Sequence, residues 1–255
     1  MVRARLIISD SRQDTHMNYF ERTYRNKINH PLLKTFNVTI RETDLFILAD
    51  TSLLDPSSRS VYKHRKYIES YIDIHPEFMT SLTPLRYDDL APPVVRDMLK
   101  AARIANVGPM AAVAGAIAEH VGRDILNESK NVIVENGGDV FIHTEQEAII
   151  CVFAGQSPLS NKIKLRIAPE HMPAGVCTSS GTVGHSLSLG NADAVCVIST
   201  SAAVADAAAT AVGNRVNSLN DIEPALKWGT TLDEVTGIII VFGNRIGVKG
   251  RIELV

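Results

Sequence analysis

The hydrophobic positions form short alternating runs and longer helical runs, and the two kinds occur in separate blocks along the chain. Residues 37–50 (NVTIRETDLFILAD) alternate and are rich in β-branched and aromatic residues, so they predict a β-strand. Residues 236–255 predict a closing hairpin with its turn at Gly243-Asn244. Further strands are predicted at 131–138, 139–144, 147–155, 162–168 and 193–199.

Helical periodicity appears between these strands. Helices are predicted near 58–72, at 93–105 and near 219–228, and residues 74–93, which contain four prolines, predict a long ordered loop. The strands come in runs rather than in strict β-α-β alternation. The pattern therefore favours an α+β fold with a mostly antiparallel sheet and helices packed on one side.

A further helix, predicted at 106–126, has small residues on one face. Ala111, Ala114, Gly115 and Ala118 recur at helical spacing. We expect this face to be buried against the sheet or a neighbouring helix, because small side chains let two elements pack closely.

The stretch STSAAVADAAATAVGN, residues 199–214, predicts an alanine-rich helix with one carboxylate and one hydroxyl group. Asp206 and Thr210 are four residues apart, so they share a face. Two oxygen donors on a bare surface suit a hard cation such as Mg²⁺. The alternative is a structural helix, in which Asp206 forms a salt bridge and Thr210 bonds to its own backbone.

Two glycine-rich stretches add polar groups. Asn136-Gly137-Gly138-Asp139 predicts a hairpin turn, or a turn whose backbone amides approach a phosphate. Residues 174–195 carry many hydroxyl groups and glycines together with His185, and we interpret them as a loop suited to a phosphate or a flavin edge. A serine–histidine hydrolase is the rival interpretation, although the sequence has no G-x-S-x-G motif.

Composition narrows the class of protein. The 255 residues are 45% hydrophobic and 21% charged with a formal net charge of −2, values typical of a globular domain and not of a nucleic-acid-binding surface. Three widely spaced cysteines favour neither a disulfide framework nor a zinc site. No run has transmembrane length and the first residues lack a signal-peptide core, so we expect a cytoplasmic protein that binds neither membrane nor nucleic acid.

Taken in order, four stretches resemble the motifs of the ApbE-type flavin transferases (FAD:protein FMN transferases). AAVAGAIAE resembles the family helix GAIAKGYAVD, and ENGGDV resembles its N-x-GGD turn. TSSGTVGHSLSLG resembles its T-S-G stretch with the following HIIDP-type segment, and ADAAATA resembles its ADALATA helix. The match covers roughly residues 105–215, while the N-terminal part is more similar to an uncharacterised ApbE-related family.

The resemblance implies an ApbE-like, T-fold-like domain over residues 1–255, with sub-lobes divided near residue 105. It implies binding of FAD and Mg²⁺, cleavage of the pyrophosphate and attachment of FMN to a threonine of an acceptor protein. Asp206 and Thr210 match metal ligands, and His185 matches a candidate general acid/base. The expected flavin-nucleotide contacts are Asn136, Gly137, Gly138, Asp139, Thr178, Ser179, Ser180 and Gly181.

The chain also departs from the family pattern. We place the family lysine of the first motif at Ala114 and the aspartate of the HIIDP-type segment at Ser188. Three functions follow as hypotheses: a Mg²⁺-dependent FMN transferase or FAD pyrophosphatase, a catalytically degenerate nucleotide-binding module, and a hydrolase using Ser179 or Ser180 with His185. The sequence leaves open the acceptor protein and whether the chain forms a homo-oligomer.

Overall fold

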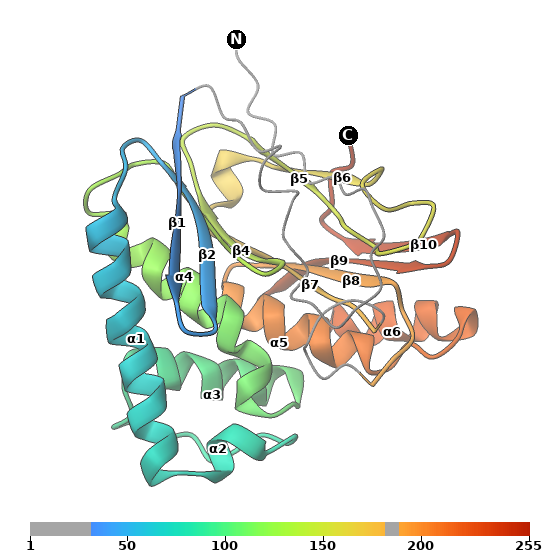
Figure 1. Ribbon diagram of the computed structural model, residues 1–255. Coiled ribbons are helices and arrows are strands. Elements are labelled where there is room, and N and C mark those ends of the chain that lie inside the picture. The colour runs from blue at the N-terminus through green and yellow to red at the C-terminus, as the bar shows by residue number, and fades with distance from the viewer. Residues whose placement is uncertain (1–31, 182–188) are drawn as a thin grey trace.

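An antiparallel sheet of eight strands organises the chain in a computed structural model that describes residues 32–181 and 189–255 (Figure 1). The strand order is β1-β2-β3-β4-β7-β8-β9-β10, and every neighbouring pair is antiparallel. The strands are β1 (Lys34–Ile40), β2 (Thr43–Ala49), β3 (Val132–Asn136), β4 (Asp139–His143), β7 (Ala174–Ser179), β8 (Ala194–Ser199), β9 (Val235–Phe242) and β10 (Arg245–Gly250).

Helices cover one face of this sheet, and a separate hairpin covers the other (Figure 1). The helices are α1 (Leu54–Ile74), α2 (Glu77–Thr80), α3 (Pro93–Ala105), α4 (Val113–Ile125), α5 (Ala202–Gly213) and α6 (Ile222–Gly229), with 3₁₀ turns η2 (Pro109–Ala112), η3 (Pro169–His171) and η4 (Leu219–Asp221). The covering hairpin consists of β5 (Ala148–Cys151) and β6 (Lys164–Ile167). The α+β class and the mostly antiparallel sheet predicted from the sequence are therefore confirmed.

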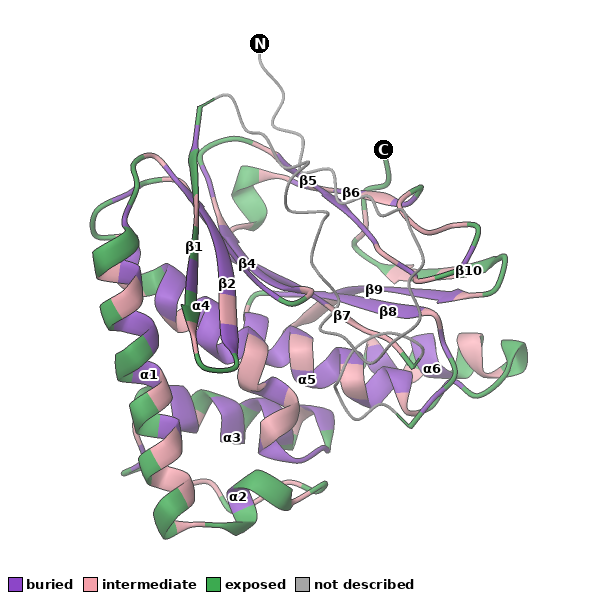
Figure 2. Ribbon diagram, in the orientation of Figure 1, coloured by how far each residue is buried: buried purple, intermediate pink, exposed green. Residues whose placement is uncertain are grey.

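Each face of the sheet has its own hydrophobic core. The larger core lies between the sheet and the helices, and it includes nearly all of α5, which is buried along its length (Figure 2). The smaller core lies between the sheet and the β5–β6 hairpin. Two buried faces explain why the central strands are almost uniformly apolar, whereas antiparallel strands with one solvated face alternate.

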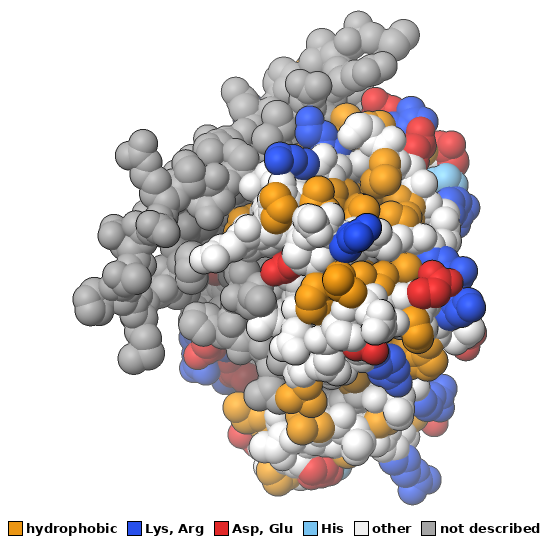
Figure 3. Space-filling model, turned by 90° about the vertical axis from the view of Figure 1, so that its right-hand side faces the viewer, with side chains coloured by type: hydrophobic (Ala, Val, Ile, Leu, Met, Phe, Trp, Pro, Cys, Tyr) orange, Lys and Arg blue, Asp and Glu red, His pale blue; other side chains and the backbone are white. Residues whose placement is uncertain are grey.

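The edge strand β10 carries exposed hydrophobic side chains. Ile246 and Val248 on β10 are 42% and 41% exposed. The side of the molecule that carries β10 and α6 shows hydrophobic side chains in patches between basic and acidic ones (Figure 3).

Three sequence predictions differ from the structure. Residues 37–50 lie in a hairpin rather than one strand, because its turn at Arg41-Glu42 lacks a glycine signal; Arg41 itself has φ 53°. The proline-rich stretch 74–93 contains the short helix α2. The hydroxyl-rich stretch 174–195 begins with a central strand, β7, whose glycine and polar residues hid its strand pattern.

Within the described parts of the chain, no single helix has both the length and the apolar character needed to cross a membrane. The helix α3 and the η2–α4 segment meet that test only as a pair, which is bent by 105°.

Candidate functional site

The two polar residues of α5 lie on the one strip of that helix that is not fully buried. Ten of its twelve residues are buried, while Asp206 and Thr210 are half-buried. Ser201 precedes the helix as its N-cap, and its hydroxyl oxygen accepts from Val204 N. It packs against β7, β8, α3 and α4. The sequence thus forms a helix that is apolar on every side except the one carrying these two oxygen donors.

Asp206 is held against the first turn of α4. Its Oδ2 accepts a hydrogen bond of 2.9 Å from the backbone N–H of Gly115, and the Ala114 amide also stabilises the carboxylate. A Cβ at position 115 would lie 2.2 Å from the Ala202 carbonyl oxygen, so glycine permits this close approach. The small residues of the predicted 106–126 helix therefore serve a helix–helix contact: Gly115 and Ala118 are buried, and Ala111 and Ala114 are half-buried.

The Asn136–Asp139 turn joins β3 to β4 beside the same helix end. Gly137 and Gly138 have φ of 70° and 114°, which glycine adopts readily. Their backbone N–H groups, which the sequence suggested for a phosphate, donate to the Glu135 carboxylate at 2.7 and 3.2 Å. The Asn136 side chain donates to the Ala114 carbonyl at 3.1 Å and so ties the turn to α4.

Asp139 brings a second carboxylate towards Asp206. Asp139 is 9% exposed, at the start of β4. Burial, and then repulsion from Asp139, raise the pKa of Asp206 well above its usual range, although the Gly115 and Ala114 amides act in the opposite direction. The pair of acidic groups is therefore unfavourable unless a proton or a cation is shared between them.

Cys177, on the neighbouring strand β7, belongs to this acidic site and had not been singled out from the sequence. It pairs with Asp139 in the sheet, and its thiol donates to the Ala202 carbonyl at 3.3 Å. Burial, and then the charges of Asp139 and Asp206, raise the pKa of its thiol well above its usual range. The one available signal was strand alternation, which would have placed Cys177 on the Asp139 face had β7 been recognised.

The hydroxyl-rich segment reaches the site through its backbone. Thr178 N donates to the Gly138 carbonyl at 3.2 Å, which joins β7 to the turn. The Thr178 side chain contacts Cys196, its cross-strand partner, whose side chain belongs to the core under the β5–β6 hairpin. The Thr178 hydroxyl is thus on the sheet face opposite Asp206. Ser179 ends β7, and Ser180 and Gly181 follow it directly.

Two sequence-predicted residues, His185 and Ser188, lie outside the described residues. The structure thus brings together Asp206, the Asn136–Asp139 turn and the first turn of α4. The acid/base role of His185 and the hydrolase hypothesis that depends on it stay predictions.

Carboxylates also cap α4 and α5 reciprocally. Asp206 of α5 accepts from the first turn of α4, and Glu119 of α4 accepts from Ala202 N at 2.7 Å and from the Ser201 hydroxyl at 2.8 Å. Arg123 donates to the other oxygen of Glu119. The shared letters GAIA align the family lysine with Glu119 rather than with Ala114, so an acidic residue stands where the family pattern has a basic one.

The donor set fits a hard cation only in part. No group of three or more His, Cys, Asp or Glu side chains in the described residues is arranged to hold a metal ion. Asp139 and Asp206 nevertheless place two carboxylates in one site, and Thr210 lies one turn along the same helix face as Asp206. Oxygen donors of this kind suit Mg²⁺, which uses one or two carboxylates and completes its shell with waters and phosphate oxygens.

Comparison with known proteins identifies the family. A family described as "AbpE bacteria" matches residues 26–232. The chain belongs to this AbpE family. Two similar proteins are named UPF0280 proteins. That of Methanocaldococcus jannaschii is 41% identical over 225 residues, covering 86% of this chain and 91% of the relative. That of Methanococcus aeolicus is 40% identical over 221 residues, covering 84% of this chain and 89% of the relative.

Solved structures confirm the fold of this AbpE-family chain. An ApbE protein of Thermotoga maritima aligns with a TM-score of 0.54 at 12% identity, covering 84% of this chain and 96% of that one. The flavinyl transferase ApbE of Pseudomonas stutzeri aligns with a TM-score of 0.52 at 10% identity, covering 86% and 94%. At such low identity these likenesses establish the architecture alone, and they confirm the ApbE-like fold that the four motifs implied.

Proposed function

We propose that this protein binds FAD with Mg²⁺ at Asp139 and Asp206, cleaves the pyrophosphate of FAD, and transfers the FMN half to a threonine of an acceptor protein. One observation carries the proposal: the half-buried Asp206 of α5 and the buried Asp139 of β4 share one site, in which their mutual repulsion opposes ionisation. A bound divalent cation relieves that repulsion. Membership of the AbpE family and the shared fold with a flavinyl transferase support the choice of substrate.

In this proposal the side chains of the protein position the metal ion and supply negative charge to bind it. Asp139 and Asp206 would hold the metal, and the Gly115 amide fixes the orientation of the Asp206 carboxylate. Bound Mg²⁺ would neutralise charge on the pyrophosphate oxygens. The threonine oxygen of the acceptor forms a bond to the FMN phosphorus, the bond from that phosphorus to the AMP oxygen breaks, and a base takes the hydroxyl proton. With water in place of threonine, the products are FMN and AMP.

Purified protein incubated with FAD and Mg²⁺ tests the proposal, with FMN and AMP measured by mass spectrometry and FAD affinity by calorimetry. We expect Mg²⁺ to tighten FAD binding by on the order of tenfold or more in the wild type. Asp206→Asn and Asp139→Asn remove one charge each and should abolish the Mg²⁺ effect. The matched control is Asp73→Asn, which removes an exposed carboxylate of α1. Equal, metal-independent FAD affinity in all four proteins would overturn the proposal.

A second candidate is a nucleotide-binding module without turnover. It is favoured by the Gly137 and Gly138 amides, which donate to Glu135 instead of pointing to an open anion site. The same experiment separates the two functions. The chain would be a nucleotide-binding module if FAD bound in a Mg²⁺-dependent way but no FMN or AMP formed, whether or not an excess of a threonine-containing protein was added.

A further inference from the structure

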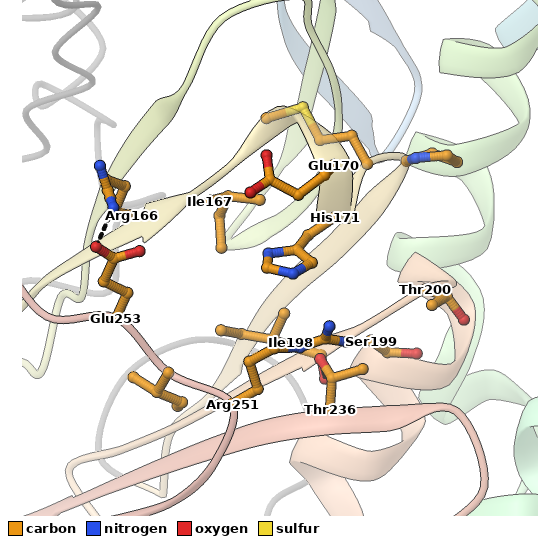
Figure 4. Close-up of a pocket in the computed structure, with 13 residues that line it drawn as sticks. Arg166, Ile167, Glu170, His171, Ile198, Ser199, Thr200, Thr236, Arg251 and Glu253 are labelled. Atoms are coloured by element: carbon orange, nitrogen blue, oxygen red, sulfur yellow. Dashed lines mark hydrogen bonds and ion pairs between the residues drawn. The ribbon is translucent and has the colours of Figure 1, made fainter.

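A cavity of about 340 Å³ lies at the end of the sheet remote from the Asn136–Asp139 turn. It opens where β8 ends at Ser199, whereas the turn adjoins the other end of the neighbouring strand β7. Its walls come from β6 and η3, from the end of β8, and from residues 251–253 after β10 (Figure 4). The cavity is therefore separate from the acidic site around Asp206.

An irregularity in the sheet shapes one wall. The register of β8 against β9 shifts between Ile198 and Ser199, which leaves Thr236 as an extra residue on β9. The Thr236 hydroxyl donates to the Ile198 carbonyl at 3.1 Å. Such a bulge re-aims side chains, and here it allows Ile198 and Ser199, which are consecutive, to line the same cavity.

The chain after β10 carries Arg251 across this bulge. Gly250 has φ 90°, and a Cβ there would lie 2.4 Å from the Thr236 carbonyl oxygen, so the crossing requires glycine. Arg251 N donates to the same Thr236 carbonyl at 2.7 Å. The Arg251 side chain runs along the cavity floor towards Ser199 and Thr236 (Figure 4).

Of the two arginines that line the cavity, Arg166 is paired with carboxylates of the described residues and Arg251 is not. Arg166, on the opposite side, forms ion pairs with two carboxylates, Glu147 and Glu253. Arg251 has no ion-pair partner among the residues that the structure describes. Glu170 is exposed, and its carboxylate points away from the Arg251 floor (Figure 4). The exposed Arg251 side chain thus presents a guanidinium group to the cavity without a counter-charge from the described residues.

The other walls of the cavity supply an imidazole group, which can form hydrogen bonds, and an apolar surface. The His171 imidazole projects into the cavity between Glu170 and Arg251 (Figure 4) and makes no hydrogen bond within the described residues. Ile167 and Ile198 are 4% and 7% exposed and close the apolar side. A guanidinium fork beside an imidazole suits a planar oxyanion, and the isoleucines suit an apolar body.

We propose that this cavity binds a small organic carboxylate, with its carboxylate on Arg251 and His171 and its apolar part against Ile167 and Ile198. The volume is in the range of small-ligand sites. The proposal is independent of FAD chemistry, because the cavity and the Asp206 site share no residue.

Calorimetric titration of the full chain with benzoate tests the proposal; acetate serves as a probe with the same head group and almost no apolar body. We expect benzoate to bind more tightly than acetate, and Arg251→Gln and His171→Gln each to weaken benzoate binding by about tenfold or more. Arg245→Gln, which removes an exposed arginine of β10 outside the cavity, should leave the affinity unchanged.

Two results would overturn the assignment. One is the absence of benzoate binding up to about 10 mM, a concentration at which even a millimolar affinity is measurable. The other is equal weakening by Arg251→Gln and Arg245→Gln, which would show general charge attraction. Urea unfolding of the same variants checks folding, so that a loss of benzoate binding is not mistaken for a loss of structure.

Discussion

Asp206 combines a structural hydrogen bond and an unfavourable charge in one carboxylate group. Its carboxylate accepts from the first turn of α4 at Gly115, a contact that an uncharged amide oxygen can also make. Its negative charge, in contrast, is opposed by burial and by Asp139. The hydrogen bond and the charge can therefore be separated by replacing Asp206 with asparagine.

We expect Asp206→Asn to be more stable than the wild type at neutral pH without metal. Because the folded pKa of Asp206 is raised, its favourable contribution is full below the ordinary carboxyl pKa of 3.8 and is lost as the pH rises through the raised value. The stability advantage of the variant should therefore grow from pH 4 towards pH 8. Urea unfolding across this range in EDTA measures it. Parallel pH profiles for the two proteins would show that the repulsion is absent, and Asp73→Asn is the control.

His64 gives a second pH dependence, at the contact between α1 and α4. Its Nε2 lies 2.9 Å from Asp124 Oδ2, and its Nδ1 is buried without a hydrogen-bond partner in the part of the chain that the structure describes. Burial, partly offset by Asp124, lowers the pKa of His64 from 6.5 to about 4. Protonation in the folded state is therefore unfavourable.

As the pH falls from 6.5 to about 4, the unfolded chain takes up a proton at His64 while the folded chain does not, so stability should fall. The loss has an upper limit of about 3 kcal/mol. His64→Gln, which can still donate to Asp124, should flatten the profile in this window when unfolding is followed by urea titration. His171→Gln, at an exposed histidine, is the control, and an unchanged slope in His64→Gln would contradict the assignment.

At the scale of elements, α4 and α5 form an antiparallel pair in which each helix caps the start of the other. Asp206 stabilises the first turn of α4, and Glu119 stabilises the first turn of α5. A negative charge at a helix N-terminus also interacts favourably with the helix dipole. The two carboxylates therefore join α4 and α5 at two points along their contact.

Glu119→Gln should lower the free energy of unfolding by about 1–2 kcal/mol, because it removes the charge from a buried cap and the ion pair with Arg123. Thermal and urea unfolding measure the loss. Glu128→Gln, at an exposed glutamate just after α4, should change stability by less than about 0.5 kcal/mol. Equal effects of the two substitutions would mean that the cap contributes nothing.

The contact at Gly115 predicts that replacing this helical glycine by alanine lowers stability, although such a replacement usually raises it. Exchange of a helical glycine for alanine usually stabilises by about 1 kcal/mol. At position 115 the added Cβ would lie 2.2 Å from the Ala202 carbonyl oxygen and 2.8 Å from Asp206 Cβ, so Gly115→Ala should destabilise by about 1–3 kcal/mol. Urea unfolding decides the sign, and a gain in stability would show that α4 and α5 can separate without loss.

For the whole molecule, helices and strands were predicted better from the sequence where glycine and polar residues did not interrupt the hydrophobic pattern. The helix predicted at 93–105 has the bounds of α3, and the hairpin turn at Gly243-Asn244 is confirmed. The strand β7 was missed because a buried central strand tolerates glycine and hydroxyl groups when α5 and the neighbouring strands satisfy them. Such compensation comes from tertiary contacts that the local pattern does not contain.

The candidate site was predicted in part, for a similar reason. Asp206 and the Asn136–Asp139 turn were identified from motif letters, and the structure places them beside one helix end. Cys177 and the capping role of Glu119 were missed, because both depend on which residues of other elements lie opposite them. Spacing along one helix shows which residues share a face, but it does not show what that face meets.

The pairing of β2 with β3 has a consequence for the order of folding. All of α1 to α4 lies between these two strands in the chain, whereas β9 and β10 pair directly across the Gly243-Asn244 turn. Closing so long a loop costs entropy before any contact is gained. The pairing of β2 with β3 should therefore form after the rate-limiting step of folding. Ile47→Val in β2, which pairs with Val134 of β3, should mainly accelerate unfolding. Ile239→Val in β9, which pairs with Val248 of β10, should mainly slow folding. Stopped-flow measurement of the folding and unfolding rates distinguishes the two variants. A slower folding rate for Ile47→Val would place the β2–β3 pairing among the earliest contacts.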